Sequence, residues 1–331
     1  MIPFEHLGCT PQVEASFERA ARKLAKAGRS CVLGRVVSLD RGFPLVRTAG
    51  GQARAELSAT LKKSADSIVA VGDWVALSQP HGHEKDIIEQ VLPRSTEIAR
   101  VKRVGRERQL RRQVLAANVD AVLICQSLTG SGLDIRLLIR QMAAVAGCGA
   151  RPLFVLTKGD LVSREDVERM CDEVRAFAPD VGLAVVSAGD AASLERVRAW
   201  CAPETTSLLL GESGVGKSSL VNALTGSEAE NVGEVRASDD RGRHTTVARR
   251  MVEVPGGGLL IDAPGLRTLQ IIDLQRSLDA AFPDIAEAAR GCRFRDCAHV
   301  DEPGCAVRDT VPPARLDAYH YLVASDWRNR A

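Results

Sequence analysis

The chain has 331 residues, enough for roughly two or three domains with their own hydrophobic cores. Hydrophobic residues make up 45% and aromatic residues only 4%, which excludes a disordered chain and predicts aliphatic cores. The net charge of +2 decides nothing about nucleic acid, so charge has to be examined locally. No stretch resembles a membrane helix, and the first residues lack the pattern of a secretory signal. We therefore expect a cytoplasmic protein with no membrane partner. We also expect it to be a monomer.

The N-terminal part is expected to form a helical lead-in followed by a small β-barrel. Phe17, Ala20, Ala21 and Leu24 are at helical spacing. Short β-rich runs, punctuated by Gly, Pro and Asp, then appear at residues 32–37, 43–46, 71–77 and 87–92. This pattern predicts a small antiparallel barrel of the OB-fold type. Trp74, in an apolar run, is either a core residue or a platform on which a base stacks.

Basic residues are concentrated in two places. Between Arg100 and Arg112 there are seven Lys or Arg residues and one acid, Glu107, and the stretch 94–112 is expected to be a linker. A second basic set comprises Arg236, Arg241, Arg243, Arg249 and Arg250. Each set is either a solvated surface or a contact surface for nucleic-acid phosphates.

From Val119 onward, strand and helix patterns alternate. Buried strands are expected at residues 119–125, 152–156, 183–186 and 208–210. Helices are expected between them at residues 134–146, 163–178 and 193–201. Asp134 suits the start of the first helix because its side chain can accept a hydrogen bond from a free backbone N–H. This alternation predicts an α/β fold, a parallel sheet with helices on both faces.

The last of these strands leads into a phosphate-binding pattern, G-x-x-x-x-G-K-[ST]. It comprises Gly211, Glu212, Ser213, Gly214, Val215, Gly216, Lys217, Ser218 and Ser219. A helical stretch follows, which completes the strand–loop–helix context that the motif requires. The glycines allow backbone N–H groups to surround a phosphate, and the helix directs its positive end at the same anion. Lys217 would reach the outer phosphates, and the Ser218 hydroxyl would hold magnesium.

Two short patterns before this loop are typical of guanine recognition. The first has the form N-K-x-D with threonine in the first position: Thr157, Lys158, Gly159 and Asp160. Its aspartate carboxylate can accept hydrogen bonds from the two N–H groups on the edge of guanine. The second pattern, whose backbone would contact the guanine oxygen, is Ser187 and Ala188. Each pattern is weak when taken alone.

Two further patterns follow the loop. The polar segment 226–250 contains Thr245 and Thr246 and matches the loop that GTPases close over magnesium and the terminal phosphate. A predicted strand at 258–261 ends in D-x-x-G, where Asp262 would approach magnesium and the Gly265 N–H would sense the terminal phosphate. The candidate magnesium ligands are thus Ser218, Thr246 and Asp262. Most GTPases have the base-recognition patterns last, so this order predicts a circular permutation, which neighbouring domain termini allow.

Three cysteines and a histidine lie close together near the C-terminus, with the spacing C-x4-C-x-H-x5-C: Cys292, Cys297, His299 and Cys305. They match the Cys3His ligand set of a structural zinc site, and four protein ligands leave no open position for catalysis. Helices expected at 277–289 and 313–324 would pack around the metal, which replaces a core too small to hold alone. A disulfide would require an oxidising compartment. The other six cysteines are expected to be reduced and mostly buried.

With these motifs in this order, the chain resembles the RsgA family of circularly permuted GTPases of small ribosomal subunit biogenesis. The resemblance covers nearly the whole chain and also includes residues 7–8, 71–75 and 115–120. It implies an OB-fold domain at 1–95, a permuted GTPase domain at 96–275 and a zinc domain at 276–331. It further implies GTP hydrolysis stimulated by the small subunit, contact with its rRNA, action late in its maturation and contact with other maturation factors. Thr157 departs from the family's more common asparagine.

Hydrolysis by an in-line water needs a group that orients the water. One class of GTPase uses a glutamine directly after D-x-x-G, but here that residue is Leu266, which cannot form a hydrogen bond. His244 is the candidate, acting with Lys217, and the resemblance supports it; alternatively, His244 binds RNA or nothing. Two other functions stay open: an RNA-docking module whose hydrolysis only limits its time on a particle, and an ATPase. Asp160 argues against the ATPase, because the adenine amino group would meet the wrong partner.

Overall fold

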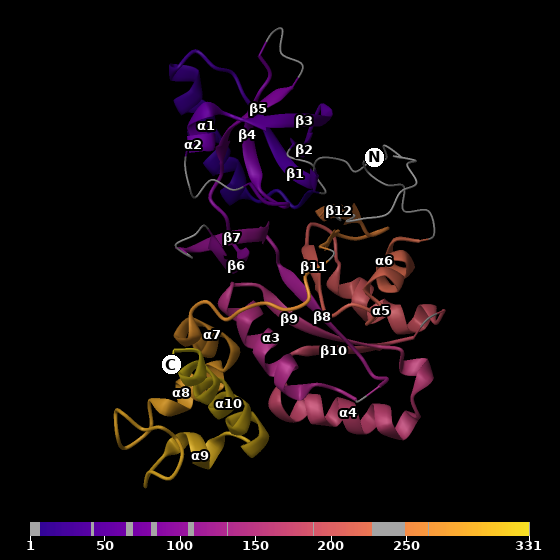
Figure 1. Cartoon of the computed structure of the whole chain (residues 1–331), viewed down its shortest axis with the longest axis vertical. Coiled ribbons are helices and arrows are strands. Elements are labelled where there is room, and N and C mark those ends of the chain that lie inside the picture. The colour runs from indigo at the N-terminus through magenta and orange to yellow at the C-terminus, as the bar shows by residue number, and fades with distance from the viewer. Residues whose placement is uncertain are drawn as a thin grey trace.

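The computed structural model describes residues 7–40, 43–63, 69–80, 85–104, 109–130, 132–187, 189–226, 249–263 and 265–330. Figure 1 shows a β-barrel at the top, a layered α/β domain in the middle and a cluster of helices at lower left. Within the described ranges, no helix combines the length and apolar character that crossing a membrane would require.

The N-terminal barrel has the predicted OB-fold architecture. After helix α1 (Pro11–Lys26) come β1 (Val32–Asp40), β2 (Phe43–Thr48), β3 (Gly51–Leu57), α2 (Ala59–Lys63), β4 (Trp74–Ser78) and β5 (Asp86–Val91). The strand order β1-β2-β3-β5-β4 closes through a β1–β4 pairing, and only β3 and β5 are parallel. Strand β3 was not predicted, because its sequence is mostly polar. In the structure most of its residues are only partly buried. Aliphatic side chains such as Val36, Val75 and Ile88 fill the interior.

The expected linker at 94–112 is wrong. Its residues form most of an antiparallel hairpin of β6 (Glu97–Val104) and β7 (Gln109–Ala117). Ile98 on β6 and Leu115 on β7 are buried in the main hydrophobic cluster, which anchors the base of the hairpin. The many arginine and lysine residues made this segment resemble a solvated linker. A sequence shows where charge lies, but it does not show which segment will pair with which as strands.

The α/β domain has the predicted parallel sheet. Its strands lie in the order β10 (Gly182–Val186), β9 (Arg151–Thr157), β8 (Ala121–Ser127), β11 (Thr206–Leu210), β13 (Leu259–Asp262) and β12 (Arg249–Glu253). Only β12, which was not predicted, is antiparallel to its neighbour. At Ser38 and Leu39, β12 also pairs with β1, so one sheet runs from this domain into the barrel.

Helices cover both faces of this sheet, as predicted. Helices α3 (Ile135–Gly147) and α4 (Arg164–Phe177) pack on one face, and α5 (Ala191–Trp200) and α6 (Lys217–Thr225) on the other. The alternation of strand side chains sets this division, since Val122 and Ile124 meet the first pair of helices while Leu123 meets the second. Asp134 caps α3, accepting a hydrogen bond of 2.9 Å from the Leu137 N–H.

The C-terminal helices pack against α3 and α4 (Figure 1). They are α7 (Leu274–Ala281), α8 (Pro283–Ala289), α9 (Ala306–Thr310) and α10 (Pro313–Arg330). The single helix expected at 277–289 is two, because Pro283 disfavours helical backbone at Phe282, whose φ is −130° and ψ 58°. Buried Arg315 on α10 donates to the Phe177 carbonyl at the end of α4, at 2.9 Å, and so ties this cluster to the α/β domain.

Candidate nucleotide and metal sites

The predicted phosphate loop lies at the edge of the sheet where the parallel strands end, between β11 and α6. Gly214 and Gly216 have positive φ angles of 82° and 97°, a conformation that favours glycine. A Cβ atom at Gly211 would lie 2.5 Å from the Cys125 carbonyl oxygen. These glycines therefore let the loop turn tightly and lie directly against the end of β8.

The ammonium of Lys217 is held by the loop itself. Its Nζ donates to the Gly211 carbonyl at 2.5 Å and the Glu212 carbonyl at 2.6 Å. Burial lowers its pKa, although the negative charge of Asp262 opposes this. Lys217 is therefore turned back onto the loop that precedes it.

The two base-recognition patterns lie next to this loop. Thr157 is buried at the end of β9, and its hydroxyl donates to the Val215 carbonyl at 2.5 Å. A Cβ atom at Gly159 would lie 3.1 Å from the Ser187 hydroxyl, so glycine lets the two patterns approach each other. Asp160 lies in the short 3-10 helix η2 (Gly159–Leu161), just beyond the end of β9. It is exposed there, at the outer rim of the candidate nucleotide site. Ala188 lies outside the described residues.

On the other side of the loop, Asp262 ends β13 and pairs in register with Arg250 of β12. Burial raises its pKa, against the opposing charges of Arg250 and Lys217. Gly265 is exposed, whereas Leu266 is only 7% exposed and packs into the main core. His244, Thr245 and Thr246 lie in the stretch 227–248, outside the described residues.

The structure adds residues that sequence reasoning missed. A cavity of about 250 Å³ lies beside the loop; its lining includes Gln126, Gln141, Gly211, Glu212 and Arg267. Gln141, buried on α3, donates to the Leu269 carbonyl at 3.3 Å and accepts from the Leu269 N–H at 2.7 Å. The sequence did contain a signal for this contact: Gln141 stands in the apolar run of α3. A buried amide needs hydrogen-bond partners, so a glutamine at such a position indicates a polar group packed against the helix.

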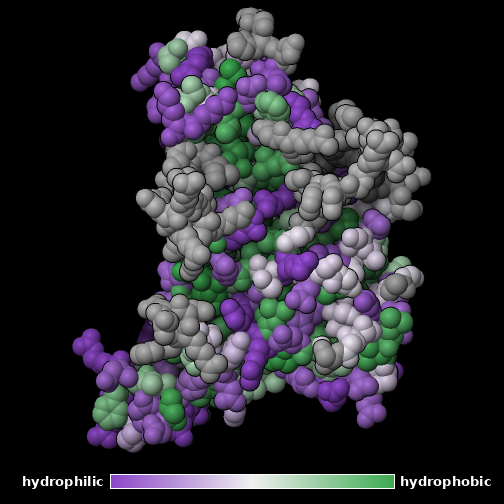
Figure 2. Space-filling view, in the orientation of Figure 1, coloured by the Kyte–Doolittle hydropathy of each residue, from purple (hydrophilic) through white to green (hydrophobic). Residues whose placement is uncertain are grey.

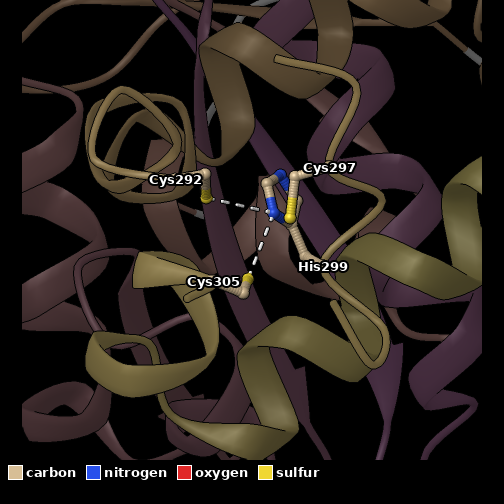
Figure 3. A group of neighbouring side chains, drawn as sticks. All are labelled: Cys292, Cys297, His299 and Cys305. Carbon is tan, nitrogen blue, oxygen red and sulfur yellow. Dashed lines mark hydrogen bonds between the residues drawn. The ribbon is translucent and has the colours of Figure 1, made fainter. Parts of the chain in front are cut away.

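The predicted metal ligands converge in one cluster (Figure 3). The ligand atoms of Cys292, Cys297, His299 and Cys305 lie within 4.8 Å of one another. The Nδ1 atom of His299 is 3.7 Å from the Cys292 sulfur and 3.5 Å from the Cys305 sulfur. The His299 backbone has a positive φ of 64°, which turns the chain between the second and fourth ligands. This cluster could hold a metal ion.

The chemistry of these groups fits a cation. Burial raises the pKa of Cys297 to about 11, and the neighbouring Cys305 and Cys292 add to the shift. Three thiolates this close would repel one another unless a positive ion lay among them. Glu302 holds the connecting turn by accepting hydrogen bonds from the N–H groups of Ala298, at 2.7 Å, and Val300, at 3.0 Å.

Parts of the two basic sets meet in space. Burial lowers the pKa of Arg249 on β12, and the positive charge of Arg100 on β6 adds to this shift. The backbone N–H of Val101, next to Arg100, donates to the Gln270 side chain at 3.2 Å. The hairpin thus contacts the segment that follows the D-x-x-G pattern, which in this chain reads D-x-P-G from Asp262 to Gly265. Arg236, Arg241 and Arg243 lie outside the described residues.

The predicted Trp74 alternatives are resolved in favour of the core. The side chain is 1% exposed and lies under the Arg35 guanidinium, 5.1 Å from the ring centroid. It cannot stack on a base from solvent.

In Figure 2, the helical end of the molecule at lower left, which is opposite the barrel, is covered mostly by hydrophilic residues.

Comparisons with known proteins agree with this arrangement. The sequence profile of the family described as RsgA GTPase matches residues 91–272. The small ribosomal subunit biogenesis GTPase RsgA of Streptomyces coelicolor is 40% identical over 308 residues, 91% of this chain and 82% of that protein. Its namesake in Methanosarcina acetivorans is 37% identical over 297 residues, 87% of this chain and 78% of that protein.

Two solved structures share the fold. The crystal structure of YjeQ from Thermotoga maritima aligns with a TM-score of 0.68 at 23% identity, covering 89% of this chain and 98% of that one. The crystal structure of YloQ, titled a circularly permuted GTPase, aligns with a TM-score of 0.66 at 23% identity, covering 90% and 96%. The circular permutation predicted from the order of motifs therefore agrees with the fold that the chain shares with YloQ.

Proposed function

The chain belongs to the RsgA GTPase family and is a GTP hydrolase, and from this we propose that it binds the small ribosomal subunit and acts late in its maturation. In this proposal the subunit stimulates hydrolysis of GTP to GDP and phosphate. The observation that carries it is the 40% identity to a small ribosomal subunit biogenesis GTPase. That identity extends over 91% of the chain and so reaches the barrel, the α/β domain and the C-terminal helices. In this proposal the domains divide near residues 95 and 275, and the protein acts in the cytoplasm, where subunits mature.

The proposed nucleotide site uses the geometry at the sheet edge. The loop from Gly211 to Ser219 holds the phosphates, and Asp160 at the rim reads the guanine edge, with Ser187 and Ala188 near the base oxygen. Ser218, Thr246 and Asp262 would hold magnesium. When bound, the ion supplies positive charge to the phosphates. Lys217 adds its own charge once a phosphate displaces the loop carbonyls.

The proposed catalytic group is His244. Leu266 packs into the core, which supports the view that the position after D-x-P-G does not orient the water. We therefore keep His244 as the group that orients the attacking water, with docking on the subunit bringing it into position. Free enzyme should then be slow, on the order of 10⁻³ per second or less, by analogy with unassisted GTPases.

The proposed metal is zinc. Three sulfurs and one imidazole nitrogen at mutual distances within 4.8 Å are the donor set of a structural zinc site. The ion would hold the segment between α8 and α9 in place. Its role is structural, because four protein ligands leave no position for substrate.

The proposed RNA contact lies where the basic sets meet. Arg100 and Arg249 come from the two basic sets and lie close enough for their charges to interact, which supports a surface whose charge suits rRNA phosphates. An rRNA strand would supply negative charge to this surface. Binding to subunits should therefore weaken as salt rises. The barrel is the second contact in this proposal, and other maturation factors are further partners.

A hydrolysis assay tests the whole proposal. Purified protein is supplied with GTP or ATP, alone or with small or large ribosomal subunits. We expect slow hydrolysis of GTP, strong stimulation by small subunits only, and no use of ATP. Lys217→Ala should abolish hydrolysis and weaken GTP binding. His244→Ala should lose most of the stimulated rate while keeping GTP affinity.

Each alternative has its own outcome in this assay. Binding to small subunits that depends on GTP but does not change the hydrolysis rate would favour the RNA-docking module. Hydrolysis of ATP at a similar rate would contradict the guanine assignment. A His244→Ala protein that hydrolyses at the full stimulated rate would remove His244 from the mechanism.

A further inference from the structure

The hydroxyl of Thr157 joins two parts of the nucleotide site that are 58 residues apart. Thr157 is 4% exposed, and its Oγ1 lies 2.5 Å from the Val215 carbonyl oxygen and 3.2 Å from the Gln126 carbonyl oxygen. Both neighbours are acceptors, and a threonine hydroxyl has one proton to donate. The shorter contact, to Val215, uses that proton.

We infer that Thr157 is a positioning residue for the phosphate loop and does not read the base. An asparagine at this position would have two N–H groups, so one could hold the loop while the other met the nucleotide. Thr157 has none left for a base nitrogen. The inference rests on the nucleotide site proposed above and changes the role of one residue in it.

The peptide geometry explains what this bond does. In a trans peptide the C=O and N–H groups point in opposite directions. Holding the Val215 carbonyl against the end of β9 therefore turns the next N–H, that of Gly216, away from the strand. Gly216 has a φ of 97° and immediately precedes α6, so this N–H belongs to the set expected to surround the phosphates. Thr157 thus aims a phosphate donor that it does not touch.

This role separates phosphate affinity from base selectivity. Losing the Thr157 hydroxyl leaves the Val215 carbonyl without its donor and the Gly216 peptide free to rotate. Every nucleotide that carries a β-phosphate should then bind more weakly, by a similar factor, whatever its base. Asp160, which is exposed at the rim, keeps its contact with the base.

The test measures dissociation constants for GDP, GTP and inosine diphosphate, which lacks the amino group that Asp160 would meet. Thr157→Val keeps the shape of the side chain and removes the hydroxyl, whereas Thr157→Ser keeps the hydroxyl. We expect Thr157→Val to weaken all three nucleotides about tenfold. The dissociation constant of inosine diphosphate divided by that of GDP should stay at the wild-type ratio, and Thr157→Ser should keep most of the affinity. Asp160→Asn should instead lower that ratio.

A matched control separates positioning from general loss of stability. Thr48→Val removes another buried threonine hydroxyl, which donates to the Gly51 carbonyl at 3.2 Å in the barrel. It should leave all three dissociation constants unchanged. If Thr157→Val does not fold, Thr157→Ala and Thr157→Ser are compared in its place.

The outcomes are distinct. Wild-type affinity in Thr157→Val, or in Thr157→Ala where it is the substitute, would overturn the inference. A fall in the ratio of the inosine-diphosphate to the GDP dissociation constant would also overturn it, because Thr157 would then help to read the amino edge of guanine. Equal losses in Thr157→Ser and the hydroxyl-free variant would do the same, since the hydroxyl would not matter. Wild-type protein that binds none of these nucleotides would instead overturn the proposed site itself.

Discussion

The Nη2 atom of Arg35 donates a hydrogen bond of 2.9 Å to the Thr206 hydroxyl, which joins the barrel to the strand that carries the phosphate loop. The same guanidinium also donates to the carbonyls of Leu7, Gly72 and Asn118. Burial lowers the pKa of Arg35 to about 10, so the group stays charged at neutral pH. One buried cation thus satisfies backbone acceptors from three separate segments, which fixes the barrel against the sheet.

Replacing Arg35 by methionine should strongly destabilise this junction. The substitution keeps much of the apolar volume but leaves several buried acceptors without a donor. We expect the free energy of unfolding in urea to fall by about 3 kcal/mol. Arg22→Met is the control, because Arg22 and its ion-pair partner Glu18 on α1 are 71% and 67% exposed, so about 1 kcal/mol or less should be lost. Equal losses in the two variants would contradict the role of Arg35.

Zinc removal should unfold the C-terminal helices first. Metal analysis of purified protein should find about one zinc per chain, from the four ligands. A strong chelator, or Cys297→Ala, should release the metal and increase hydrogen exchange in α8 and α9 while nucleotide binding persists. Cys31→Ala, in the barrel, should keep the zinc. Protein without zinc, in which Cys292 and Cys297 form a disulfide, would refute the assignment.

Replacing Gln141 by leucine should loosen the segment between D-x-P-G and the C-terminal helices. The change leaves the N–H and C=O groups of Leu269 buried without partners, at a cost of roughly 1–3 kcal/mol. We expect the Leu269 amide to exchange with solvent at least about tenfold faster than in wild type. Gln275→Leu is the matched control, because that amide is exposed on α7 and donates to Asp279 on the same helix. Unchanged exchange at Leu269 would mean that packing, not Gln141, holds the segment.

The contact between Asp284 and Arg315 should make stability depend on pH in acid. Burial alone would raise the pKa of Asp284, but the hydrogen bonds and charge of Arg315 outweigh it and lower the pKa. A lowered carboxyl pKa stabilises the folded state above the unfolded pKa near 4, and this contribution is lost as the pH falls through the folded pKa. Asp284→Asn should therefore cost about 1 kcal/mol at pH 7, a modest value because the carboxylate is 38% exposed.

Thermal unfolding of Asp284→Asn and wild type, compared at each pH from about 7 down to 3, tests this dependence. The difference between the two should stay constant down to about pH 5 and shrink below it. Asp309→Asn, at an exposed position on α9, should show no such change. A difference that grew in acid would reverse the sign and refute the contact's contribution.

The sequence by itself determined whatever depends on neighbours along the chain. The phosphate loop needs its glycines between a strand and a helix, and the Cys3His cluster needs its ligands within one short stretch, so both are visible as spacing. The alternating strands and helices, the Asp134 cap and the permuted order of motifs are local in the same sense. The OB-fold also followed from short β-rich runs, although the polar strand β3 carried too little hydrophobic signal to be seen.

Only the tertiary structure decided which distant residues meet. Thr157 and Val215 are 58 residues apart, Gln141 and Leu269 128, and Arg35 and Thr206 171. Each pair joins a side chain to a group on another element, and no local pattern identifies that partner. The same holds for the hairpin of β6 and β7, which the sequence predicted to be a linker. Strand pairing depends on two segments together, whereas charge can be counted in one segment alone. The physical reason is that a buried donor or acceptor must find a partner, but which partner depends on how the elements pack.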